Sequence, residues 1–167
     1  MRREEVAAMD LISRYFWVIC LVVTGFNYFI GRRRIISSDL VSIDNASIAQ
    51  SYLVRFSIAS SLPWLIMGWG QIFGNVPTVW YYFRPQDRNL FVIAWFGLIF
   101  FIAVACAYWV FLANGAKKLL ETQFFTVFGA RGQFGLSERM IKLFAALGPL
   151  LVLGWICLAA LMNLPLP

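Results

Sequence analysis

The residue types that usually carry out chemistry are sparse in this sequence. It contains no histidine, so imidazole-held haem, histidine-ligated zinc or copper and a histidine general base are all excluded. Its three cysteines, Cys20, Cys106 and Cys157, lie far apart in apolar runs, as small buried residues often do. We therefore predict no metal site and no cofactor held by this chain alone, while a bound lipid, quinone or pigment stays open.

Acidic and nucleophilic groups are placed no better for catalysis. None of the eight Asp and Glu residues lies near the centre of a long apolar run, where a carboxylate would indicate a proton or ion path. Ser60 and Ser61 precede Pro63 on an apolar segment and lack the Gly-x-Ser-x-Gly pattern of a hydrolase nucleophile. The sequence therefore predicts that the chain is not an enzyme.

Three polar residues inside apolar runs are better candidates for binding than for catalysis: Asn27, Arg55 and Gln71. A long arginine can extend toward a membrane surface, so Arg55 is interpreted first as a snorkelling side chain. A pair with a carboxylate or a lipid phosphate is its alternative. Asn27 and Gln71 are predicted to form hydrogen bonds between helices, or with a partner subunit or a quinone carbonyl.

The densest cluster of aromatic and cationic residues lies in a short connection that includes Trp80, Tyr81, Tyr82, Arg84 and Arg88. Tryptophan and tyrosine settle at headgroup level, where arginine meets phosphate, so this segment is interpreted first as part of an interfacial belt. The same residue types anchor protein interfaces. The alternative is therefore a docking surface for a lipid, a quinone headgroup or a protein partner.

Composition indicates the elements that must position these residues. Apolar residues make up 61% of the chain and charged residues only 13%, too few charges to cover a water-soluble surface. Because the 14 Lys and Arg residues stand between apolar runs, a nucleic-acid partner is excluded. We predict an all-α membrane protein, a bundle of four transmembrane helices at about 11–30, 48–73, 89–113 and 140–162 that forms a single integral membrane domain over residues 1–167.

Local signals predict the ends and bends of these helices. Pro63 and Pro149 are expected to kink the second and fourth helices. The predicted end signals are Gly31 and Asn114-Gly115, and the predicted start signals are the Ser47-x-x-Gln50 capping box, Asp87 and Ser137-Glu138. A shorter helix over about 116–128 is expected to lie in the membrane interface.

Small residues spaced four apart predict where helices approach closely. Gly70 and Gly74 form such a pair on the second helix, and Ala103 and Ala107 form one on the third. This spacing does not indicate whether the neighbouring helix belongs to the same chain.

The distribution of cations predicts the orientation. Four crossings place nine of the 14 Lys and Arg on one side of the membrane and five on the side of both termini. Since Lys and Arg accumulate in the cytoplasm, both termini are predicted to be extracytoplasmic, in a bacterial inner membrane or an organelle membrane.

These features favour a non-catalytic accessory or structural subunit of a larger membrane complex. Such a subunit would contact membrane lipids and other membrane subunits, or associate with itself. The alternative is a small transporter or channel component in which the proline-containing helices flank a pathway. A membrane-embedded lipid-modifying enzyme ranks third, because histidine and a central carboxylate pair are missing.

Overall fold

The computed structural model describes residues 3–37, 43–122, 124 and 137–161, and within them the chain is all-helical. Four long helices are present: α1 (Arg3–Ile36), α2 (Ile43–Phe73), α3 (Leu90–Leu112) and α6 (Glu138–Leu161). A short helix, α4 (Gly115–Glu121), follows α3. Two 3-10 helices, η1 (Val79–Phe83) and η2 (Pro85–Asp87), connect α2 to α3.

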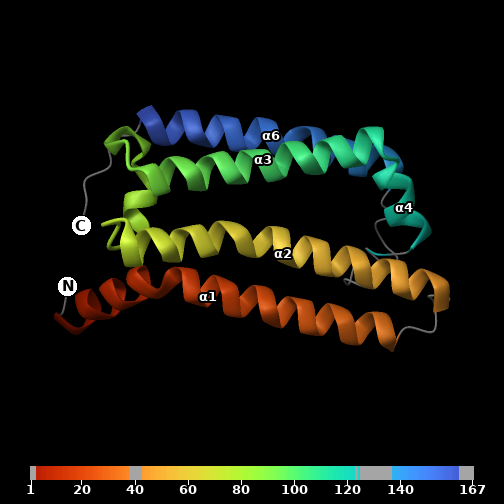
Figure 1. Cartoon of the computed structure of the whole chain (residues 1–167), viewed down its shortest axis with the longest axis horizontal. Coiled ribbons are helices and arrows are strands. Elements are labelled where there is room, and N and C mark those ends of the chain that lie inside the picture. The colour runs from red at the N-terminus through yellow and green to blue at the C-terminus, as the bar shows by residue number, and fades with distance from the viewer. Residues whose placement is uncertain (1–2, 38–42, 123, 125–136, 162–167) are drawn as a thin grey trace.

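The long helices lie side by side in the order α1, α2, α3, α6, each antiparallel to the next along the chain (Figure 1). The broadest contacts pair α1 with α2 and α3 with α6, so the long helices form two hairpins. A smaller contact between α2 and α3 joins the two hairpins. No other pair of long helices makes a comparable contact among the described residues. The arrangement is therefore an open layer, in which α1 and α6 form the two edges.

Two small cores hold the layer together, one at each end. At the α4 end, Ile35, Ala49, Leu53 and Val110 pack with residues of α4 and α6. At the opposite end, called here the η end, Met67, Val92 and Trp95 pack around Tyr82 of η1. The first residue of α1 and the last residue of α6 both lie at the η end (Figure 1).

Three of the described helices are long and apolar enough to cross a membrane. They contain the segments Met9–Ile36, Leu90–Leu112 and Glu138–Leu161. The chain is therefore consistent with a multi-pass membrane protein. Helix α2, with 31 residues, is long enough to cross a membrane but is not among these three; it contains Arg55, Gln71 and several serines.

Several predicted helix ends are wrong. Helix α1 does not stop at Gly31 but continues through the arginines to Ile36, since Ile35 is buried in the core at the α4 end. Helix α2 begins at Ile43, so Ser47 lies inside the first turns and does not cap the helix. Asn89, not Asp87, is the N-cap of α3, and its side-chain oxygen accepts a hydrogen bond from the Phe91 amide at 2.9 Å.

Other local predictions are confirmed. Helix α3 ends at Leu112 and Asn114 adopts a left-handed conformation with φ of 55°, as the predicted Asn-Gly stop requires. Helix α6 begins after Ser137, whose hydroxyl accepts a hydrogen bond from the Met140 amide at 3.3 Å. Both α2 and α6 continue through their prolines, so a kink at either one remains a prediction.

The predicted interfacial helix is found only in its first part. Helix α4 has seven residues, with Ala116 and Leu119 buried and Lys117 and Lys118 exposed. The helix therefore has an apolar and a cationic side, and its position in a membrane interface remains a prediction. Apart from Phe124, the remainder of the predicted range, from 123 to 128, lies outside the described residues.

Candidate functional site

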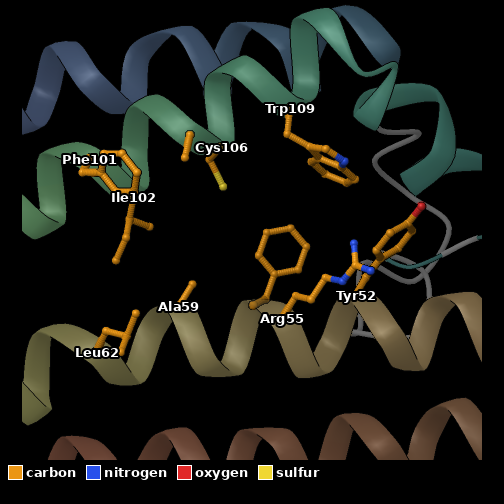
Figure 2. Close-up of a pocket in the computed structure, with 10 residues that line it drawn as sticks. Tyr52, Arg55, Ala59, Leu62, Phe101, Ile102, Cys106 and Trp109 are labelled. Carbon is orange, nitrogen blue, oxygen red and sulfur yellow. The ribbon is translucent and has the colours of Figure 1, made fainter.

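A groove of about 330 Å³ lies between α2 and α3 (Figure 2). Apolar and aromatic side chains from both helices make up most of its lining, and one side chain is charged. Helix α2 contributes Tyr52, Arg55, Phe56, Ala59 and Leu62, and helix α3 contributes Phe101, Ile102, Ala105, Cys106 and Trp109. We call this feature the α2–α3 groove.

Aromatic rings close the end of the groove nearest α4. Trp109 meets Tyr52 edge-to-face with 5.4 Å between ring centroids, and it meets Phe56 in the same way at 6.0 Å. Edge-to-face contacts of this kind contribute stability in addition to that from the apolar area that they bury. Gly115 makes room for the indole of Trp109, since a Cβ atom at residue 115 would stand 2.6 Å from that ring. The backbone of α4 at Gly115 therefore packs directly against the Trp109 ring.

Arg55 is the charged group of the groove. Its side chain is exposed and extends along α2 toward Tyr52, as Figure 2 shows. Among the described side chains, no carboxylate lies within ion-pair distance of its guanidinium; the four ion pairs present there involve other cations. The predicted carboxylate partner of Arg55 is therefore not found in the described part of the chain.

The residues predicted to form a docking surface do not all lie on the surface. Trp80 and Arg88 are exposed, and Tyr81 is half-buried. Arg84 is paired with Asp87 at 3.3 Å. Tyr82 is fully buried, so it cannot belong to an exposed docking surface of this chain.

Tyr82 instead connects the loop to both neighbouring helices. Its hydroxyl donates a hydrogen bond to the carbonyl oxygen of Met67 in α2 at 3.0 Å, and its ring meets Trp95 of α3 at 5.3 Å. Burial raises the pKa of Tyr82 above its ordinary value, which keeps the phenol neutral and able to donate. Through these two contacts Tyr82 holds η1 against α2 and α3.

The Gly70 and Gly74 pair does permit close approach, but to bulky side chains. A Cβ atom on Gly70 would collide with the Tyr82 hydroxyl and would lie 2.9 Å from Cβ of Phe91. A Cβ atom on Gly74 would likewise collide with the Phe91 ring. The two glycines therefore seat Tyr82 and Phe91 of the same chain. Both alanines of the second pair, Ala103 and Ala107, are half-buried on α3.

The other polar residues predicted inside the spans occupy different settings. Asn27 is exposed on α1. Gln71 is half-buried, and its amide nitrogen and oxygen are shielded without a hydrogen-bond partner among the described residues. Gln71 also lines a cavity of about 350 Å³ at the η end, together with Arg14 and Trp17. These amide atoms need water or another chain to satisfy them.

No group of three or more metal-binding side chains occurs within the described residues. Cys106 lines the α2–α3 groove and is half-buried, Cys20 is also half-buried, and Cys157 is exposed. The groove therefore combines one cation with an aromatic and aliphatic lining, a combination that suits the binding of an amphiphilic molecule.

Sequence reasoning missed several contributors to these sites. Tyr52, Phe56 and Ala59 recur at intervals of four and three around Arg55, a helical spacing that could have identified the groove-facing side of α2. Asn89 directly precedes an uninterrupted apolar run, which is the position of an N-cap.

Comparison of the chain with protein-family models, curated proteins and solved structures finds no match.

Proposed function

We propose that this chain is a non-catalytic integral membrane protein that crosses the bilayer four times and serves as an accessory or structural subunit of a larger membrane complex. In this proposal α2 is the fourth span. Helix α2 lies between α1 and α3 and packs against both, and each of these neighbours is long and apolar enough to cross a membrane. A helix held between two spans must itself lie at membrane depth.

The polar groups of α2 are compatible with that position. The hydroxyls of Ser60 and Ser61 both donate hydrogen bonds to the carbonyl oxygen of Ser57, at 3.0 and 2.7 Å. Hydroxyls that are satisfied by their own helix need no water, so they are tolerated in hydrocarbon. The lower hydropathy of α2 is therefore no obstacle to crossing.

The observation that carries the subunit proposal is the open layer. Within an apolar stretch of 18 residues in each helix, only 6% of the residues in α1 and in α6, and 17% of those in α3, are buried within the chain. Large side chains such as Trp69, Phe101 and Tyr108 are more than half exposed along the helices. Since small and aromatic side chains pack well between membrane helices, these free faces suit neighbouring subunits as well as lipid.

Trp80 and Arg88 are proposed as the contact with a partner at the η end, because both are exposed and belong to residue types that anchor interfaces. Tyr82 and Arg84 are omitted because this chain uses them internally. Arg32, Arg33, Arg34, Lys117 and Lys118 all lie at the opposite, α4 end (Figure 1). We propose that the α4 end faces the cytoplasm, which makes both chain ends extracytoplasmic.

Gentle detergent extraction followed by native sizing and identification of co-migrating chains tests the subunit proposal. The chain is expected to migrate in a stoichiometric complex with other membrane proteins. Replacing Trp80 with Ala and Arg88 with Gln together should lower recovery of the partner about tenfold or more, since anchor residues contribute about 2 kcal/mol or more.

The matched control is Lys118→Gln, which removes an exposed cation at the opposite, α4 end. It should leave recovery of the partner unchanged if the loop is the contact. A self-contained homo-oligomer would contradict the subunit proposal and favour the small transporter or channel component. A monodisperse single chain would contradict both.

A further inference from the structure

The α2–α3 groove is polar at one end and apolar along the remainder of its length. Arg55 and Tyr52 lie at the end nearest α4, whereas Leu62 of α2 and Phe101 of α3 line the far end. From Arg55 to Leu62 the helix advances by about 10 Å. The groove therefore runs along the helix axes, with its one cation at one extremity.

The polar end of the groove lies at the level where lipid headgroups are found. Tyr52 and Phe56, on either side of Arg55 in α2, both contact Trp109, which is one helical turn before the last residue of α3. Because α3 is long and apolar enough to span the membrane, its last turn falls near the interface. Tryptophan and tyrosine prefer that depth. The apolar end, at Leu62 and Phe101, consequently points toward the middle of the bilayer.

The distribution of charge in the groove selects the occupant. Arg55 is exposed at the groove and has no carboxylate partner among the described side chains, so an anion from outside the chain can pair with it. Guanidinium binds phosphate through two parallel hydrogen bonds. From Arg55 to the far end of the groove the lining consists of aliphatic and aromatic side chains, which suit an acyl chain.

We propose that the α2–α3 groove is a binding site for an anionic phospholipid, whose phosphate pairs with Arg55 and one of whose acyl chains lies in the groove between Ala59 and Cys106. This inference rests on the proposed crossing of the membrane by α2. It deepens the proposed function by assigning one specific lipid contact, which would fill the gap between the two hairpins midway between the two cores.

Native mass spectrometry of the full-length chain in detergent tests the proposal. The protein is titrated with phosphatidylglycerol or with phosphatidylcholine carrying identical acyl chains, and the dissociation constant of the first lipid is measured for each. We expect one phosphatidylglycerol to bind about fivefold more tightly than phosphatidylcholine, a factor equivalent to about 1 kcal/mol for one arginine near an anionic lipid surface. Equal affinity for the two lipids would overturn the proposal.

Three variants assign the binding to this groove. Arg55→Gln should remove the preference for phosphatidylglycerol. Arg55→Lys keeps the charge but loses the two parallel hydrogen bonds of a guanidinium, so it should retain only part of that preference. Arg32→Gln is the matched control, since it removes an exposed arginine at the α4 end outside the groove. If Arg32→Gln weakens the binding of phosphatidylglycerol as much as Arg55→Gln does, a general attraction between the cationic protein and the anionic lipid explains the binding, and the proposed site is refuted.

A fourth variant tests the acyl-chain part of the site. Ala59→Phe should fill the groove and weaken both lipids by a similar factor, because the tail contact is the same for both. Unchanged lipid binding would refute the assignment. If the wild-type chain instead binds no lipid but forms dimers, and Ala59→Phe abolishes those dimers, the occupant of the groove is a second copy of the chain. Since the titration uses the isolated chain, its outcome is independent of whether partner subunits co-purify.

Discussion

Gly70→Ala is the substitution whose effect the structure defines most sharply. The new methyl group would collide with the Tyr82 hydroxyl and lie 2.9 Å from Cβ of Phe91. Overpacking a close-packed interior costs about 1–3 kcal/mol. Because Cβ of Phe91 is attached directly to the backbone of α3, it cannot rotate away, so the helices must separate. We therefore expect a loss of about 2–3 kcal/mol in the free energy of unfolding.

A double-mutant cycle with Tyr82→Phe identifies the cause of that loss. Tyr82→Phe alone should cost about 1 kcal/mol, since it removes a buried hydrogen bond to the Met67 carbonyl. It also removes the oxygen that Gly70→Ala strikes first. In the Tyr82→Phe background, Gly70→Ala should therefore cost about 1 kcal/mol less than in the wild type, the remainder being due to Phe91.

The assay is reversible unfolding of the purified protein in mixed detergent micelles, followed by circular dichroism. Gly97→Ala is the matched control, because a Cβ atom there would have no neighbour within 4 Å apart from the adjoining backbone of α3. That substitution should be neutral or stabilise the helix by up to about 1 kcal/mol. The reasoning is refuted if Gly70→Ala behaves like Gly97→Ala, or if its cost is the same with and without the Tyr82 hydroxyl.

Two further predictions concern the η end. Asn89→Ala should destabilise the protein by about 1–2 kcal/mol in the same assay, because the side chain caps α3 and also donates to the Gly74 carbonyl at 2.9 Å; an unchanged free energy would show that neither bond matters. Burial raises the pKa of Tyr82 above the ordinary value of about 10, so the unfolded chain loses this proton first as the pH rises. Stability should therefore fall above about pH 10, and more steeply than in Tyr82→Phe; identical pH profiles would contradict the burial of this phenol.

The lengths of the apolar runs predicted the long helices. In lipid such a run must satisfy its backbone hydrogen bonds within itself, so it forms a helix whatever its neighbours are. Their ends were harder to predict. Glycine inside a helix costs about 1 kcal/mol, so Gly31 is a reasonable stop signal, yet burial of Ile35 against Ala49 and Leu53 compensates for it. Packing between α1 and α2 thus extends both helices beyond their local signals.

The candidate sites divide in the same way. Arg55 could be selected from the sequence because a charge in an apolar run is unusual, but the groove beside it depends on which face of α3 lies opposite. Tyr82 could not be separated from Trp80 and Tyr81, since aromatic residues suit a membrane interface and a core equally well. Gly70 makes room for the Tyr82 hydroxyl, and this glycine lies twelve residues away in the chain.

The account depends most on the crossing of the membrane by α2, and labelling of single cysteines in sealed membrane vesicles tests it most directly. With Cys20, Cys106 and Cys157 replaced by alanine, a cysteine is introduced in place of Arg34, at the α4 end, or of Gln86, at the η end. A membrane-impermeant thiol reagent should then label one of these two variants in right-side-out vesicles and the other in inverted vesicles. Labelling of both from the same side would show that α2 does not cross, and would contradict the four-span arrangement.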